Sequence, residues 1–390
     1  MNIYEKLGVR EVINANGTKT HLGGTIPDSR VMDAMTEASR SFVVMMELIE
    51  KAGEIIAEAT GAEDGLVTSG SSAGMTLAAA ACIMKGSELE NVDTHPVERV
   101  DLDKDWIEII QRLPDTSWTH NELIVQKMHR HSFDHAYKIA GAKLVNVGSN
   151  QGCSLKEIET AITDNTAAIA FTARVDNSPE KAGKNVPLKK VIELAHNHDI
   201  PVIVDAASEL PPQSKLSEYI DEGADLVIIS GGKHMGGPND TGILCGRHDL
   251  IKLAKLQAAP YRGIGRGMKV DRTQIVGLIT ALKIYLEKDE KVKFERDKKM
   301  VKWMTETLTN TSNVLQSESV IQEARKRLFT FITLEPNIAR DLVYKLRKNN
   351  PSIWIELQSI GRVEIDPSNL KDGEEKIVIS NIKKILNELK

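Results

Sequence analysis

A lysine stands in a glycine-rich segment, SGGKHMGGPNDTG, that directly follows the apolar run DLVIIS. The flanking glycines bring the backbone of Lys233 close to another group, so a freely solvated surface charge is a poor explanation. A desolvated lysine loses its proton readily and can attack a carbonyl carbon. The segment is not a P-loop, because the pattern GxxxxGK[ST] is absent. Lys233 is therefore our candidate for a catalytic residue.

An aspartate, Asp205, ends the apolar run PVIVD. A carboxylate at the end of a buried strand is costly unless it meets a cation or a hydrogen-bond donor. A protonated ring nitrogen of a ligand, a metal ion or a neighbouring arginine would each serve. Asp205 is therefore predicted to face such a partner.

The segment SGSSAG, Ser69–Gly74, follows the run GLVT and opens a helical stretch, MTLAAAACIM. Small residues allow close approach, and the free N–H groups of a first helical turn bind anions, which predicts a phosphate site at Gly70, Ser71 and Ser72. A serine N-cap with glycines for a tight turn is the alternative. The segment also matches G-x-S-x-G, with Ser72 as the nucleophile of a hydrolase, but no Asp/His pair follows at later strand ends.

A basic loop, PYRGIGRGMKVDR, places four cations and three glycines between residues 260 and 272. Arginine forks and a lysine point charge suit a phosphate or a carboxylate. We predict that Arg266 and Lys269 bind an anionic group of the substrate. A basic hinge in solvent is the alternative.

The elements that carry these residues alternate short apolar runs with amphipathic helical stretches, the pattern of βαβ units and a mostly parallel sheet. Ligands of such sheets bind outside the carboxyl ends of the strands, so residues just after a strand are the ones expected to meet. The predicted strands are Gly65–Ser69, Glu122–Lys127, Lys143–Val147, Ala167–Thr172, Pro201–Asp205, Asp225–Ser230 and Gly242–Gly246.

The pattern changes after Arg272, where a long helical stretch runs to about Thr309 and is expected to bend or break near Glu287–Glu290. Strand-like and helical runs then alternate to the end. We predict an α/β fold with three parts: an N-terminal arm and helix over 1–60, a large α/β domain over 61–270 and a small α+β domain over 271–390. The acidic segment 85–121 is predicted to be an inserted loop with a short helix.

The composition is that of an ordinary soluble protein, with 390 residues and a formal net charge of -5. Three widely spaced cysteines and no CxxC pair argue against a disulfide framework and against a zinc site. No apolar run reaches the length of a membrane span, and the acidic balance gives no footprint for nucleic acid. We expect a cytoplasmic protein with no metal, no membrane partner and no nucleic acid partner.

The predicted phosphate segment, Asp205 and Lys233 follow one another along the chain, and Lys233 stands 28 residues after Asp205. This arrangement resembles that of the fold-type-I pyridoxal-phosphate (PLP) enzymes. Four segments carry a closer resemblance to the selenocysteine-synthase-like branch, and within it to the D-glucosaminate-6-phosphate ammonia-lyases. Bacterial selenocysteine synthases are longer and carry an N-terminal tRNA domain, which supports the expectation that tRNA is not a substrate here. The segments are GVREVINANGTKTHLGG, RLPDTSWTHNELIVQKMHRHSFDHA, SGGKHMGGPNDTGILCG and IGRGMKV.

The resemblance implies an aspartate-aminotransferase-like fold and PLP as cofactor. Lys233 would form the Schiff base, and Asp205 would partner the pyridinium nitrogen. His129 would stack on the ring, with His131 as a competitor; a surface pair or an HxH metal site is the alternative. The phosphate would be bound by Gly70, Ser71 and Ser72, with Ser230 beside it.

For the substrate, the resemblance implies an anionic small molecule, with Arg130 at a carboxylate and Arg174 and Asn177 facing the site. The implied reaction is elimination of ammonia with dehydration from an amino-sugar acid such as D-glucosaminate 6-phosphate, giving a 2-keto-3-deoxy acid. A homodimer or higher oligomer is implied too. The alternatives are another PLP activity (selenium transferase, aminotransferase or racemase) and, from a different class, a serine hydrolase.

Overall fold

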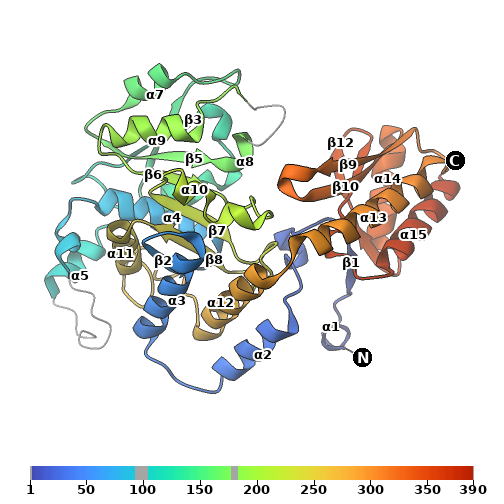
Figure 1. Ribbon diagram of the computed structural model, residues 1–390, viewed down its shortest axis with the longest axis horizontal. Helices are drawn as coiled ribbons and strands as arrows, with labels where there is room; N and C mark the ends of the chain where they lie inside the picture. Colours follow the sequence, from blue (N-terminus) through green and yellow to red (C-terminus); the bar gives the residue numbers. More distant parts are fainter. Residues whose placement is uncertain (1, 93–103, 177–182, 390) are drawn as a thin grey trace. The chain divides into compact units, whose positions relative to one another are not determined.

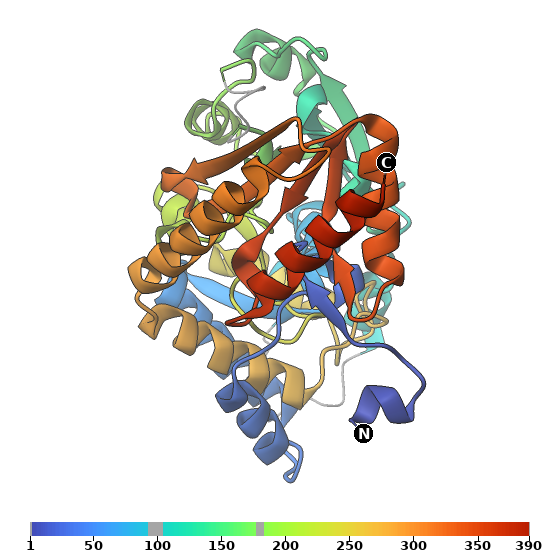
Figure 2. The same ribbon diagram turned by 90° about the vertical axis from the view of Figure 1, so that its right-hand side faces the viewer.

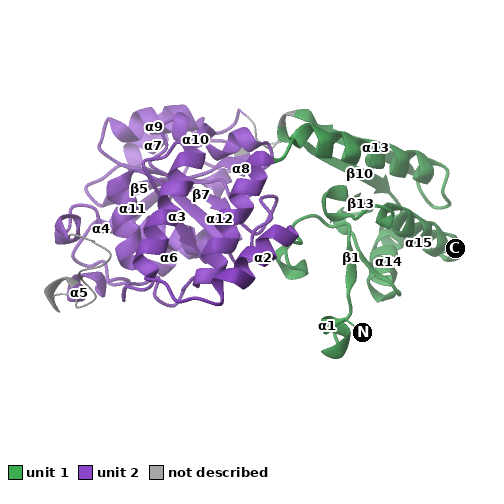
Figure 3. Ribbon diagram, turned by 60° about the horizontal axis from the view of Figure 1, so that its bottom comes forward, with its two compact units in different colours: residues 1–26, 288–390 green, residues 27–287 purple. Residues whose placement is uncertain are grey.

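The computed structural model describes residues 2–92, 104–176 and 183–389. The chain forms two compact units, one of residues 27–287 and one that combines residues 1–26 with 288–390 (Figure 3). These limits differ from the expected boundaries at 60 and 270. The N-terminal 26 residues join the C-terminal unit because a short strand near the N-terminus pairs with a strand near residue 353.

The larger unit is built on a seven-stranded sheet in the order β2-β8-β7-β6-β5-β3-β4 (Figure 1). Only β8 runs against the others, because it pairs antiparallel with both β2 and β7 while every other pair is parallel. All seven strands are where the sequence predicted them, within one residue at most ends. They are β2 Asp64–Thr68, β3 Glu122–Gln126, β4 Lys143–Val147, β5 Thr166–Thr172, β6 Val202–Asp205, β7 Leu226–Ser230 and β8 Gly242–Gly246.

Helices cover both faces of this sheet. On one face Gly74 of α4 approaches Ile228 and Thr68, and on the other Ile56 of α3 packs on Gly65, so glycines set the closest approaches. α6 and α11 pack beside α4, and α12 packs on α2 and α3. The helices of this unit are α2 Ser29–Ala38, α3 Met45–Thr60, α4 Gly70–Met84, α5 Lys104–Ile110, α6 His135–Ile139, α7 Leu155–Ala161, α8 Ala173–Asp176, α9 Leu188–His196, α10 Glu218–Asp221, α11 His248–Gln257 and α12 Arg272–Glu287.

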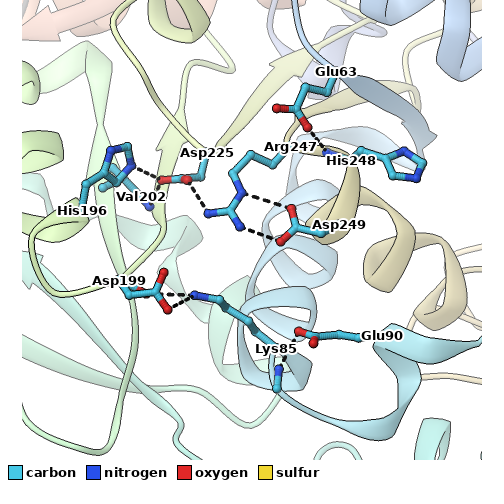
Figure 4. A network of polar contacts seen from close by, with 11 residues as sticks. Glu63, Lys85, Glu90, His196, Asp199, Val202, Asp225, Arg247, His248 and Asp249 are labelled. Atoms are coloured by element: carbon cyan, nitrogen blue, oxygen red, sulfur yellow. Dashed lines mark hydrogen bonds and ion pairs between the residues drawn. The ribbon is translucent and has the colours of Figure 1, made fainter.

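A polar network ties the amino ends of β6 and β7 to the segments beside them (Figure 4). The buried carboxylate of Asp225 accepts hydrogen bonds from Arg247 Nη1 at 3.0 Å and from the Val202 backbone N–H at 2.8 Å, and His196 Nε2 lies 2.9 Å from it. A buried carboxylate with cationic and N–H partners stabilises only while those partners remain. The network therefore has a structural role at the amino ends of these strands.

The smaller unit contains a four-stranded antiparallel sheet, β12-β13-β10-β9, and a two-stranded parallel pair, β1 with β11 (Figure 2). Strand β10 alternates buried and half-buried residues, because one face of the sheet packs on helices and the other does not. The elements are α1 Ile3–Lys6, β1 Val12–Asn14, α13 Glu290–Thr309, β9 Gln316–Gln322, β10 Arg327–Thr333, α14 Pro336–Lys348, β11 Ser352–Trp354, β12 Glu356–Ser359, β13 Arg362–Ile365 and α15 Glu374–Glu388.

The long helical stretch breaks as predicted, with α12 ending at Glu287 and α13 starting at Glu290. Asp289 caps α13 by accepting a hydrogen bond from the Lys291 backbone N–H at 2.8 Å. In the described part of the chain, no helix is both long and apolar enough to cross a membrane.

Candidate active site

The turn that carries Lys233 follows β7 and folds back on its own return segment. A Cβ on Gly232 would lie 2.4 Å from the Asn239 Cα, and one on Gly231 would lie 2.5 Å from the Thr241 Oγ1. The Gly231 backbone N–H also donates to the Thr241 carbonyl at 2.9 Å. The glycines are thus needed for this hairpin to close. The sequence predicted that the backbone around Lys233 approaches another group closely, and that group is the return segment of the same chain. The turn leaves Lys233 half-buried at the carboxyl end of β7.

The predicted phosphate site lies at the first turn of α4, directly after β2. Gly70 has a φ of +77°, and a Cβ there would meet nothing within 4 Å, so the turn is open on that side. The Ser69 side chain makes no capping hydrogen bond. The first N–H groups of the helix, at Gly70, Ser71 and Ser72, thus remain available to an anion.

Strand β8 connects this turn to the lysine turn. Gly242 pairs with Thr68 of β2 on one side and with Ser230 of β7 on the other. A Cβ on Gly242 would lie 2.9 Å from the Ser71 backbone nitrogen. Ser230 and the α4 terminus therefore flank the same glycine, which brings the predicted phosphate ligands to one place.

Asp205 ends β6, the neighbour of β7, and its residue is buried. One carboxylate oxygen accepts a hydrogen bond from the Ala207 backbone N–H at 3.0 Å. The other lies 3.4 Å from the His131 Nε2. The carboxylate is thus held at the same sheet edge as Lys233, by one backbone N–H group and with an imidazole at ion-pair distance.

The structure gives the two histidines different surroundings. His129 is fully buried, and its ring meets Phe171 edge-on at 4.5 Å. Its Nδ1 accepts the Thr172 backbone N–H at 3.2 Å, and its carbonyl accepts the Thr172 hydroxyl at 3.1 Å. His129 joins the end of β3 to the end of β5 through these two hydrogen bonds, and its ring packs on Phe171.

His131 is half-buried and faces Asp205. Its Nδ1 accepts the Phe133 backbone N–H at 3.1 Å, and its Nε2 lies 3.5 Å from Asp134. Burial alone would lower the pKa of His131, but Asp205 and Asp134 outweigh it and raise the pKa above its usual value. Among the described residues, no group of three His, Cys, Asp or Glu side chains is arranged to hold a metal ion.

The predicted substrate residues differ in their surroundings. Arg130 contacts Asp134 and Asn146, so its guanidinium is already paired. Arg174 is exposed in the short helix α8, after β5. Asn177 lies outside the described residues.

In the basic loop the charges divide into two kinds. Arg272 donates to the carbonyls of Ala38 and Ser39, which fixes the end of α2. Arg266 and Lys269 are exposed. A Cβ on Gly263 or Gly265 would collide with the backbone of Gln257, so these glycines pack the loop onto α11.

These side chains fit the groups of PLP. The uncapped N-terminus of α4, with the open turn at Gly70, suits a phosphate. The buried carboxylate of Asp205 suits a protonated ring nitrogen, and Lys233 stands one strand away. The sequence analysis did not single out Asp134, although it lies in one of the four segments that carry the resemblance, or Thr172, which ends a predicted strand.

Solved structures share this fold. D-glucosaminate-6-phosphate ammonia-lyase superposes on the whole chain with a TM-score of 0.82, 27% sequence identity and 99% coverage of that chain. The aspartate aminotransferase of Thermotoga maritima matches in fold alone, with a TM-score of 0.53 and 16% identity over 98% of this chain and 94% of its own. The protein is a PLP-dependent enzyme of fold type I, which confirms the predicted fold class and cofactor.

The chain belongs to the L-seryl-tRNA selenium transferase (SelA) family, whose model matches residues 133–333. It is 32% identical to the 5′-C-glycyluridine monooxygenase-decarboxylase of a Streptomyces species, over 96% of this chain and 90% of that protein. It is 29% identical to the D-glucosaminate-6-phosphate ammonia lyase of Salmonella typhimurium, over 98% of each. The resemblance seen in the sequence is confirmed.

Proposed function

We propose that the protein is a PLP-dependent lyase that removes water from an amino-sugar acid such as D-glucosaminate 6-phosphate and then releases ammonia as one water is taken up again. The product would be a 2-keto-3-deoxy acid. The observation that carries the proposal is the single sheet edge shared by Lys233, Asp205 and the start of α4. The ammonia lyase that matches over the full length supports the substrate class.

PLP, when bound, withdraws electrons from the substrate carbon that carries the amine. We propose that Lys233 would hold the cofactor until the substrate amine takes its place, and that the freed Lys233 amine would then remove the proton from that carbon. Asp205 holds a proton on the ring nitrogen, because a close carboxylate favours the charged form. Gly70, Ser71 and Ser72 bind the phosphate through backbone N–H groups.

We propose His131, in place of His129, as the histidine that contacts the cofactor. His131 is half-buried beside Asp205, whereas His129 is hydrogen-bonded to Thr172 and joins the ends of β3 and β5. Ser230 lies beside the phosphate through its pairing with Gly242.

For the substrate we propose that the exposed Arg266 and Lys269 bind its phosphate or carboxylate, and that Arg174 lies at the same sheet edge. Arg130 is not proposed as a ligand, because its guanidinium is paired with Asp134 and Asn146. We also propose a homo-oligomer, a dimer at least, working in the cytoplasm.

The test is an ammonia-release screen of the purified holoenzyme over phosphorylated and unphosphorylated amino-sugar acids. Ammonia and a 2-keto-3-deoxy acid in equal amounts are expected from the phosphorylated substrate, and no release from any member would contradict the proposal. Borohydride reduction and peptide mapping should place the pyridoxyl group on Lys233. A label on another lysine would reject that assignment.

A second activity is favoured by the Streptomyces relative, which is a monooxygenase-decarboxylase by name. Another PLP reaction on a related amino acid is therefore the runner-up. Oxygen uptake and carbon dioxide release from a glycyl nucleoside, without ammonia release from amino-sugar acids, would decide for it. The hydrolase alternative loses its basis, because no described histidine or carboxylate is hydrogen-bonded to the Ser72 hydroxyl.

A further inference from the structure

One buried carboxylate lies behind the proposed cofactor histidine. The Asp134 side chain is only 6% exposed, and Oδ2 accepts the His131 backbone N–H at 3.2 Å. Oδ1 lies 3.5 Å from the His131 Nε2. Asp134 thus touches both the backbone and the ring of His131.

The ring of His131 has a defined orientation. Its Nδ1 accepts the Phe133 backbone N–H, which requires a lone pair on that nitrogen. The ring proton then resides on Nε2, which faces Asp134 at 3.5 Å and Asp205 at 3.4 Å. Both carboxylates lie within ion-pair distance of this nitrogen, and neither is close enough to accept a good hydrogen bond from it.

Arg130 fixes Asp134 from the other side. Its Nε contacts Asp134 Oδ2 and its Nη1 contacts Asn146 of β4. Asp134 is therefore tied to the outermost strand of the sheet as well as to the turn after β3. The buried carboxylate is compensated by one cation, Arg130, and by one backbone N–H group, that of His131.

We propose that Asp134 is a positioning residue that holds the His131 ring against the cofactor when Asp205 engages the ring nitrogen. The proposal rests on the cofactor roles proposed above for His131 and Asp205. Without the Asp134 carboxylate, the Nε2–H of His131 has only the Asp205 carboxylate at ion-pair distance, and it competes with the cofactor for that carboxylate.

A purely local role is the competing explanation, because Asp134 and His131 also form a capping box at the start of a short 3₁₀ turn. Asp134→Asn separates the two roles. The amide oxygen still accepts the His131 backbone N–H, but the charge that faces Arg130 and His131 is lost. Glu157→Gln is the matched control, since Glu157 closes a capping box of the same kind with Ser154 at the start of α7.

The experiment titrates PLP into the apoprotein, follows affinity by fluorescence, and records the induced circular dichroism of the bound cofactor. Asp134→Asn should weaken PLP binding roughly 10- to 100-fold and change the dichroism. The melting temperature of the apoprotein should stay that of wild type, and Glu157→Gln should match wild type in all three. If Asp134→Asn has the PLP affinity and the dichroism of wild type, Asp134 serves only to cap the 3₁₀ turn, and the proposal is overturned.

A double-mutant cycle covers the case in which Asp134→Asn also loses stability. If Asp134 acts through His131, Asp134→Asn adds no further loss of PLP affinity to His131→Asn. Fully additive losses would overturn the proposal. If His131→Asn alone leaves PLP affinity unchanged, the role proposed for His131 fails instead, so the two failures are distinguishable.

Discussion

Asp205 ends β6 and Lys233 follows the end of the neighbouring parallel strand β7, so both come to the same edge of the sheet although 28 residues separate them. Their residue types are those expected for ring protonation and proton transfer. The proposed chemistry therefore depends on these two side chains.

Asp205→Asn should keep the shape of the site but remove the charge that holds a proton on the ring nitrogen. Turnover is expected to fall by orders of magnitude while part of the PLP stays bound, measured by steady-state kinetics and absorbance. Asp199→Asn, an exposed aspartate paired with Lys85, is the matched control and should be near wild type. Near-normal turnover in Asp205→Asn would contradict the assigned role.

Arg266→Ala should raise KM for a phosphorylated substrate much more than for its unphosphorylated analogue, because only the former loses a charge-assisted pair. Arg262→Ala is the control, since Arg262 is exposed in the same loop. Equal effects on both substrates would exclude reading of the phosphate and leave cofactor binding or carboxylate recognition.

Glu364 of the smaller unit gives a pH-dependent prediction. Burial raises the pKa of Glu364 to about 7, and Asp366 adds to the rise. The folded state therefore keeps a proton that the unfolded chain releases near pH 4.5, and stability falls as the pH rises from about 4.5 to 7.

Glu364→Gln should accordingly raise the free energy of unfolding at pH 8, by up to about 2–3 kcal/mol, and change little near pH 4.5. Its side-chain oxygen can still accept the hydrogen bond from Gln358. Denaturant titrations at both pH values measure the effect, and an equal gain at both would show that charge is not its cause.

At the scale of elements, the hairpin from β7 to β8 determines where Lys233 points. Gly232→Ala would drive a Cβ into the Asn239 backbone, so the return segment must shift. We expect at least a tenfold loss of turnover, since a displacement of about 1 Å is costly at a reacting group. Gly267→Ala is the control, because a Cβ there meets nothing within 4 Å. Unchanged kinetics in Gly232→Ala would show that the turn is more tolerant than its geometry indicates.

The strands could be predicted, and candidate site residues proposed at their ends, because both depend on local signals. A strand buried on both faces needs a continuous apolar run, and the edge rule then selects the residue after it. The choice between His129 and His131 could not be made locally, since it depends on which ring meets Phe171 and which meets Asp205. Strand β9, QSESVIQ, was missed because its polar composition carries no strand signal.

At the scale of the whole molecule, the expected domain limits failed to anticipate β1. Its three residues pair with β11 more than 300 positions later, and a pairing at that distance leaves no trace in a short sequence window. The helix α12 likewise stays with the larger unit because it packs on α2 and α3.

An exposed apolar segment supports oligomerisation. Phe42 is 97% exposed, and Val43 and Val44 beside it are about half exposed, which is unusual for a surface that stays in water. We expect a dimer by light scattering, with an interface of upwards of ~2,000 Å². Phe42→Ser should weaken it, whereas Phe133→Ser, another exposed phenylalanine, should not. A fully active monomer would refute this prediction.

Strand β8, which runs antiparallel to the other strands of its sheet, also sets the distance between two parts of the proposed site. The phosphate turn and the lysine strand lie on either side of it, so two strand spacings, about 10 Å, separate them. This distance is set by backbone hydrogen bonds and does not depend on which side chains surround the substrate. The residues around the substrate, and with them the reaction, could therefore change in evolution while the distance between these two parts of the sheet stayed the same.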